Sequence, residues 1–139
     1  MDNQLLIQLL EELNIENTDE KVNDEAISRL LGDWVHIKTE LEVLYRNRDQ
    51  KSTIQGMKKG IGLFIQFLFW GNEKEINLKD FEPLERLEIK PVNLDERLGL
   101  IIRRPNLYHS YRQLSELMVE QEKLYAKKNI VKTRLGPKG

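Results

Sequence analysis

The most apolar stretch of the chain lies near its middle, from Gly60 to Gly71, with the sequence Gly-Ile-Gly-Leu-Phe-Ile-Gln-Phe-Leu-Phe-Trp-Gly. A helix that is hydrophobic on all sides belongs in the interior of a protein. Burial of an aromatic side chain contributes about 1.5–3 kcal/mol relative to exposure. The pattern therefore predicts a buried central element that places Phe64, Phe67, Phe69 and Trp70 in the core, with the other helices packed around it.

A helix suits this stretch better than a strand, although short apolar runs fit both. Ser52 or Thr53 can cap a helix N-terminus, and Gly71-Asn72 can end one. We therefore predict a helix over residues 54–70, with a kink or a start near Gly60 as the alternative.

The glycines of the predicted central helix have a packing interpretation. A helix-interior glycine costs about 1 kcal/mol relative to alanine. Gly56 and Gly60 are four residues apart, so they share one helix face and allow a neighbouring helix to come close. The segment from Gly56 to Gly62 matches neither the phosphate-binding P-loop nor the dinucleotide fingerprint. Packing is the favoured explanation.

Periodic apolar positions elsewhere predict the surrounding helices. We expect a short helix near the N-terminus, a long helix from about residue 24 to 45 capped by Asn23 or Asp24, one helical turn after Pro83, a short helix from Asn93 or Asp95 to Ile102, and a last helix over residues 106–130. The prediction is an all-α, single-domain bundle of four or five helices around a central hydrophobic helix. It spans residues 1–135, with a frayed C-terminal end at 136–139.

Charge and cellular location follow from the composition. The chain has no cysteine, which fits a reducing compartment, and no basic region precedes its first apolar residues, as a secretory signal would require. The apolar run is about half of the roughly 20 residues that a membrane-spanning helix needs. We therefore expect a cytoplasmic protein. Its net charge of −1 argues against nucleic-acid binding through the whole molecular field.

Two basic clusters are candidate binding sites. The run Tyr108-His109-x-Tyr111-Arg112 follows Arg103-Arg104, and its two phenols, imidazole and guanidinium group could hold a phosphate or carboxylate. The candidate ligand residues are Arg103, Arg104, His109, Tyr111 and Arg112. The alternative is that they only cap and line the start of the last helix. The basic C-terminal residues Lys123, Lys127, Lys128, Lys132 and Arg134 are candidates for weak contacts with nucleic acid or an acidic partner.

Neither a metal site nor a catalytic residue is predicted. Asp33 and His36 have the spacing found in metal sites of helical bundles, but such a site needs further inward-facing Glu or His ligands, and His109 is the only other imidazole. We expect Asp33 and His36 to be ordinary surface or half-buried residues, and we expect no cofactor.

Three segments resemble the YpoC-like family of small bacterial proteins: the aromatic run from Phe64 to Asn72, the sequence Pro-Val-Asn-Leu at 91–94, and Arg103-Arg104-Pro105. The resemblance covers roughly the second half of the chain. It implies an all-helical fold, and it transfers no catalytic residue.

The leading functional expectation is a non-catalytic cytosolic protein that acts through protein–protein interaction, with another protein or a second copy of itself. One alternative is a ligand-binding or enzymatic bundle that uses the Arg103 to Arg112 cluster on an anionic group. The other is a weak nucleic-acid-associated accessory protein that uses its basic C-terminus. Convergence of the cluster on a pocket is the feature that separates the first two.

Overall fold

The computed structural model describes residues 3–15 and 23–135, with the backbone alone for 131–135. Over these residues the chain forms α1 (Asn3–Glu12), α2 (Asp24–Arg46), α3 (Gln50–Gly71), the 3-10 turn η1 (Leu84–Arg86), α4 (Leu94–Arg103) and α5 (Tyr108–Leu135), and it has no strand. The predicted all-α bundle is confirmed, including the helical turn after Pro83. The expected frayed end at 136–139 lies outside the described residues.

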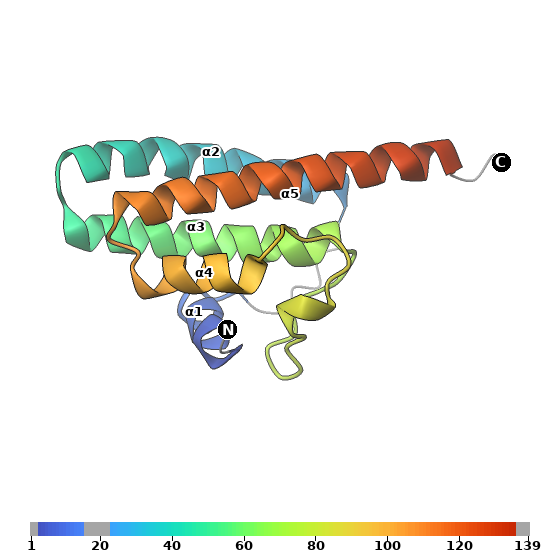
Figure 1. The fold of residues 1–139 in the computed structure, drawn as a ribbon, viewed down its shortest axis with the longest axis horizontal. Helices are drawn as coiled ribbons and strands as arrows, with labels where there is room; N and C mark the ends of the chain where they lie inside the picture. The colour runs from blue at the N-terminus through green and yellow to red at the C-terminus, as the bar shows by residue number, and fades with distance from the viewer. Residues whose placement is uncertain (1–2, 16–22, 136–139) are drawn as a thin grey trace.

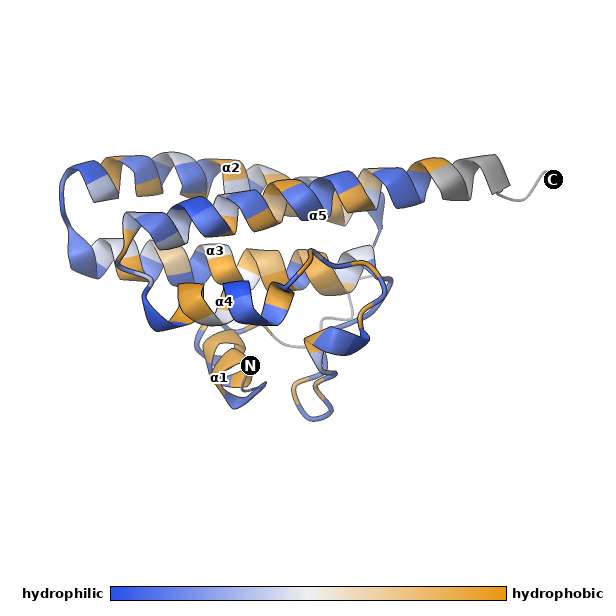
Figure 2. Ribbon diagram, viewed as in Figure 1, coloured by the Kyte–Doolittle hydropathy of each residue, from blue (hydrophilic) through white to orange (hydrophobic). Residues whose placement is uncertain are grey.

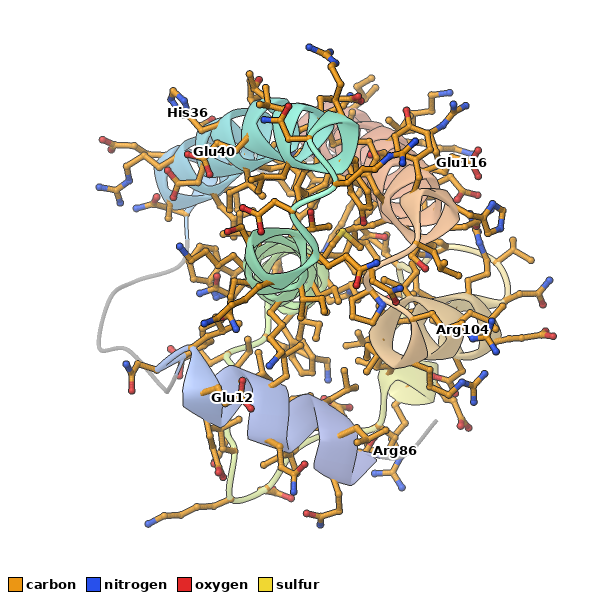
Figure 3. The ribbon with its side chains drawn as sticks, turned by 90° about the vertical axis from the view of Figure 1, so that its left-hand side faces the viewer. Glu12, His36, Glu40, Arg86, Arg104 and Glu116 are labelled. Carbon is orange, nitrogen blue, oxygen red and sulfur yellow. The ribbon has the colours of Figure 1, made fainter. Side chains whose placement is uncertain are left out.

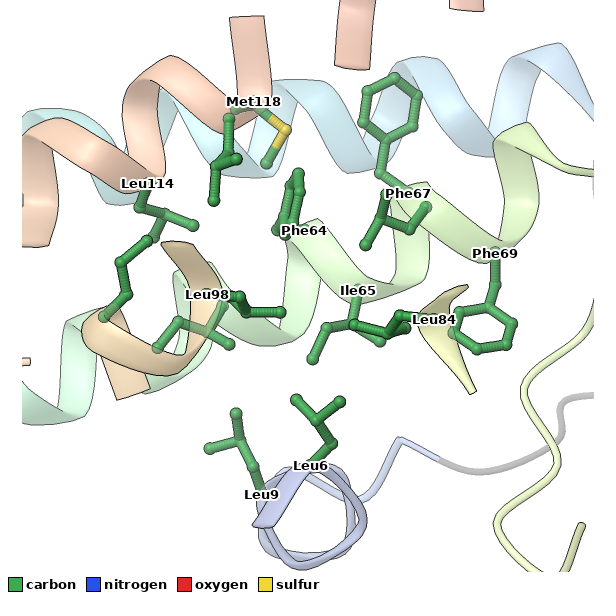
Figure 4. Close-up of a cluster of buried hydrophobic side chains, with 14 of the residues drawn as sticks. Leu6, Leu9, Phe64, Ile65, Phe67, Phe69, Leu84, Leu98, Leu114 and Met118 are labelled. Carbon is green, nitrogen blue, oxygen red and sulfur yellow. The ribbon is translucent and has the colours of Figure 1, made fainter. Parts of the chain in front are cut away.

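Helix α3 occupies the centre of the bundle. Figure 1 shows α2 and α5 running along it, and the end-on view of Figure 3 shows α1, α2, α4 and α5 around it. Phe64, Ile65 and Phe67 are completely buried, and Figure 4 shows them between side chains of α1, α4 and α5. Figure 2 shows that α3 is predominantly hydrophobic, whereas α2 and α5 alternate between hydrophobic and hydrophilic residues, as expected for helices with one exposed face.

The start of α3 differs from the prediction. The cap is Asp49, whose side chain accepts a hydrogen bond from the backbone N–H of Ser52 at 3.1 Å. That bond lowers the pKa of the Asp49 carboxyl. The helix therefore begins at Gln50, earlier than predicted, and it continues to Gly71 as one element, so the alternative of a start near Gly60 is wrong. The predicted cap Asn23 of α2 is confirmed, because its side chain accepts from Ala26 N–H at 2.8 Å.

Glycines of α3 allow α2 to lie close to it, as the spacing predicted. A Cβ atom at Gly56 would lie 2.9 Å from Cδ2 of Leu41. A Cβ atom at Gly60 would lie 2.9 Å from Cζ3 of Trp34 and 3.1 Å from Cδ2 of Leu114, which belongs to α5. The rigid Trp34 ring cannot give way easily, so Gly60 requires glycine at this helix separation, whereas a Cβ atom at Gly56 would meet only the flexible end of the Leu41 side chain.

The connection between α3 and α4 is tied to the bundle through Ile89. The Asn72 side chain accepts from Ile89 N–H at 2.7 Å and donates to the carbonyl oxygens of Ile89 at 2.8 Å and Leu68 at 2.6 Å. The buried Gln121 of α5 donates to the same Ile89 carbonyl at 3.2 Å. These bonds orient the connection so that its apolar side chains Ile76, Phe81, Leu84 and Leu87 are buried, as expected.

The last helix begins later and ends later than predicted, at Tyr108 and Leu135. Its core face is confirmed, because Leu114, Leu117 and Met118 are completely buried. Leu107 lies within the predicted helix but precedes the observed one, and at 40% exposed it does not belong to this face.

Substitution of Gly60 by alanine should destabilise the protein by about 1–3 kcal/mol, because the new methyl group overlaps the Trp34 ring. Gly32 of α2 is the matched control, since a Cβ atom there has no neighbour within 4 Å. Gly32→Ala should stabilise the protein by about 0.5–1 kcal/mol through helix propensity. Urea unfolding measures both changes, and a stabilising Gly60→Ala variant would contradict the close packing of α2 on α3.

Phe67→Ala should cost about 3–5 kcal/mol, a large part of the stability of a small domain. Trp70 was also expected in the core, but it is only partly buried because it lies on the outer side of the last turn of α3. Trp70→Ala should therefore cost clearly less than Phe67→Ala. Thermal unfolding of the two variants compares them, and equal destabilisation would show that this end of α3 is packed differently.

Candidate functional site

Two turns that are distant in sequence meet at one end of the bundle. The Tyr45 hydroxyl, near the end of α2, donates to the carbonyl oxygens of Pro105 at 2.9 Å and Leu107 at 3.2 Å. This interaction places the α2–α3 turn beside the α4–α5 turn, at the left end of Figure 1 and facing the viewer in Figure 3. We call the exposed basic side chains at this end the cationic pole: Arg46, Arg48, Lys51, Arg103, Arg104, His109 and Arg112.

The arginines of the cationic pole form no ion pair with the described acidic side chains. In the part of the chain that the structure describes, no ion pair or side-chain hydrogen bond engages its five arginines or His109. Of the nearby carboxylates, Glu42 accepts from the Tyr111 hydroxyl at 2.7 Å, and Asp49 caps α3 beside Lys51. The exposed Glu116 lies one helical turn after Arg112 and lines the same hollow. Cations still outnumber carboxylates at this end, which favours an anionic partner.

Helix dipoles account for only part of this arrangement. Arg46 and Arg103 lie in the last turns of α2 and α4, where the dipole stabilises a cation. His109 and Arg112 lie in the first turns of α5, where the dipole disfavours a cation by a few tenths of a kcal/mol, and the first turn carries no acid. Arg48 adopts a left-handed backbone with φ of 56°, which a glycine would adopt at lower cost. The stability of the fold therefore does not explain why Arg48, His109 and Arg112 occupy these positions.

A cluster of three tyrosines lies beneath the cationic pole. The ring centroids of Tyr45, Tyr108 and Tyr111 are 5.4–5.5 Å apart. Burial raises the pKa of Tyr45 above its ordinary value, and burial together with the bond to Glu42 raises the pKa of Tyr111. The predicted role of Tyr111 as an anion ligand is wrong, because its side chain is 1% exposed and bonded to Glu42.

Among the tail residues, Lys128 has a structural role. Its Nζ donates to the carbonyl oxygen of Gly71 at 3.0 Å, at the end of α3, and lies 4.0 Å from Oε1 of Glu73. The Tyr125 hydroxyl donates to Asp24 at the start of α2. Lys123 and Lys127 are exposed, and the side chains of Lys132 and Arg134 lie outside the described residues.

The surface hollows do not gather the predicted cluster into one pocket. A hollow of about 340 Å³ lies beside Arg112 and is lined by Arg97, Ser115, Glu116, Val119 and Glu120 as well. Arg103, Arg104 and His109 do not line it. The predicted residues therefore share an end of the bundle but not this hollow.

A second hollow, of about 420 Å³, contains Asp33 and His36. They line it with Glu40 of α2 and with apolar side chains that include Leu13 and Leu63, and Figure 3 shows His36 and Glu40 on the outer side of α2. Within the described residues no group of three or more His, Cys, Asp or Glu side chains is placed to hold a metal ion.

Sequence reasoning missed Arg46, Arg48 and Lys51 as members of the site. The run Arg-Asn-Arg-Asp at 46–49 was interpreted as a solvated helix end. Its local sequence gives no sign that the chain brings residues 103–112 beside it. The arrangement depends on the Tyr45 hydroxyl and on the common packing of α2 and α5 against α3.

These features define an all-α helical bundle with an exposed basic end, and the comparisons with known proteins place it more closely. The model of the YpoC-like protein family matches residues 24–133, so the chain belongs to this family. The chain is 30% identical over 96 residues to the "Uncharacterized protein YpoC" of Bacillus subtilis (strain 168), a match that covers 68% of this chain and 58% of the relative. No solved structure matches.

The family match is wider than the resemblance in the second half of the chain, because it begins at the start of α2. The whole cationic pole lies within the matched residues. In the described part of the chain, no helix combines the length and the hydrophobicity needed to span a membrane.

The raised pKa values of Tyr45 and Tyr111 predict a loss of stability at high pH. An ordinary tyrosine has a pKa of about 10, so the unfolded chain ionises at lower pH than the folded one. The stabilisation is therefore fully present below about pH 10 and is lost as pH rises above it. Urea unfolding across this range, compared with a Tyr45→Phe variant, should show a weaker pH dependence in the variant. An identical dependence would exclude Tyr45 as a source.

Proposed function

We propose that this protein is a non-catalytic binding module that holds an anionic partner at its cationic pole. The observation that carries the proposal is a set of five exposed arginines that form no ion pair within the described residues and lie at two chain reversals that only the fold brings together. Arginine guanidinium groups bind carboxylates and phosphates through paired, charge-assisted hydrogen bonds. A partner with several anionic groups would bind more tightly for each group that pairs with an arginine.

A binding role suits this end of the molecule better than catalysis. Catalytic sites depend on side chains held in a fixed geometry in a site from which water is excluded. The cationic pole is a projecting end of the bundle, and its one imidazole, His109, is exposed. The polar groups that are fixed beneath it, Tyr45, Tyr111 and Glu42, are bonded to one another or to the backbone and support the fold.

If the partner is another protein, this proposal requires it to present an acidic surface that pairs with the arginines of the cationic pole. A second copy of the chain would not do so through the same surface, because a symmetric interface would bring like charges together. Self-association through the pole is therefore disfavoured.

Arg48→Gly is the most informative substitution in the cationic pole. It removes one charge and relieves the left-handed backbone, so the variant should fold with equal or higher stability. Combined with Arg104→Glu, it should lower the salt concentration at which the protein elutes from heparin. Asn14→Gly, a change at another left-handed position that removes no charge, is the backbone control.

Lys127→Glu is the control for position, because Lys127 is an exposed cation in the C-terminal half of α5, away from the pole. It should change heparin elution less than Arg104→Glu, although both variants alter the net charge equally. Equal shifts would show that only net charge matters and would contradict a site at the cationic pole. Absence of heparin binding at low salt by the unaltered protein would contradict the proposal as a whole.

A further inference from the structure

We infer that the anionic partner is a single-stranded nucleic acid and that Tyr108 provides a stacking surface for one of its bases. This inference rests on the proposed function and adds the class of partner. Sequence-tolerant binding of single strands combines basic side chains along the backbone with aromatic rings on which bases stack. The cationic pole and the tyrosine cluster beneath it supply both components.

Tyr108 is an exposed aromatic side chain held in place from behind. It is 45% exposed, and its ring makes an edge contact with Tyr45 and a tilted contact with Tyr111. Each of these supporting rings is fixed through its hydroxyl, Tyr45 by two backbone carbonyls and Tyr111 by Glu42. A ring fixed before binding loses little conformational entropy when a base stacks on it.

Arginines flank this ring. Arg112 lies one helical turn after Tyr108, on the same face of α5. Arg46 directly follows Tyr45, the residue against which the Tyr108 ring packs. Leu107, also 40% exposed, adds apolar surface beside the ring. Arg112 therefore offers a guanidinium group to a phosphate next to a stacked base, Arg46 adds positive charge at the same end, and guanidinium planes can themselves stack on bases.

The same geometry disfavours the other anionic partners. Bases of a duplex are stacked on one another and cannot reach Tyr108, and the arginines come from helix ends and turns, not from one helix that enters a groove. An acidic protein segment would use the arginines but would gain little from an exposed phenol ring. A small free anion would not be enclosed, because Arg103, Arg104 and His109 do not share the hollow beside Arg112.

Tyr108→Leu tests the stacking surface, and Tyr108→Phe is its matched control because it keeps the ring. Fluorescence anisotropy would measure binding of a labelled mixed-sequence DNA single strand of about 16 nucleotides, the corresponding RNA, the DNA duplex and poly-L-glutamate. We expect Tyr108→Leu to weaken single-strand binding roughly 5- to 150-fold, the range that removal of one stacked base implies. Tyr108→Phe should stay within about twofold of the unaltered protein.

The salt dependence of binding distinguishes the contribution of the arginine charges from that of the Tyr108 ring. Each single-strand phosphate that the protein no longer neutralises should reduce the slope of log affinity against log salt by about 0.7. Arg104→Glu should reduce this slope, whereas Tyr108→Leu should lower affinity and leave the slope unchanged. If Tyr108→Leu unfolds, Tyr108→Trp replaces it, and its added indole fluorescence should be quenched by the single strand.

Equal binding of duplex, poly-L-glutamate and single strands, with no effect of Tyr108→Leu, would overturn the inference and leave the proposed binding of anions intact. Absence of quenching in Tyr108→Trp would overturn it as well. Failure of every polyanion to bind would overturn the proposed function together with the inference.

Discussion

The apolar surface of the second half of α3, from Gly60 to Gly71, is the constraint on which the rest of the structure depends. A helical segment without a continuous polar face must be covered from every direction, and α1, α2, α4 and α5 surround α3. Gly56 and Gly60 set how closely α2 approaches, because side chains of α2 occupy the space where their Cβ atoms would lie. Since α2 and α5 both pack along α3, the turns at their adjoining ends become neighbours.

Polar side chains then fix the connections between the packed helices. The partly buried Asn72 and the buried Gln121 bond the backbone at Ile89, and Lys128 bonds the final carbonyl of α3. Tyr45 performs the same task at the opposite end, where its hydroxyl joins the α4–α5 turn to α2. Each such hydrogen bond contributes about 0.5–1.5 kcal/mol net.

At the cationic pole, as at Glu73 with its φ of 58°, local preferences and the observed residues disagree. Stability favours glycine at the position of Arg48 and acidic residues in the first turn of α5, where His109 is found. Conflicts of this kind are expected at functional sites, where the residue is selected for what it binds and the remaining structure offsets its cost. The tyrosine cluster beneath the pole supplies rigid support for these residues.

The sequence by itself determined the helices and most of their core faces, because hydrophobic periodicity and capping residues such as Asn23 act within a few positions. It also located the glycines that allow close packing, and its resemblance to the YpoC-like family identified the family. Only the tertiary structure decided that Tyr111 turns inward to Glu42, that Lys128 binds the end of α3, and that Arg46 and Arg48 join Arg103 and Arg104. These outcomes depend on interactions between residues 57 to 69 positions apart, such as Lys128 with Gly71 and Tyr111 with Glu42, and no local pattern encodes such interactions.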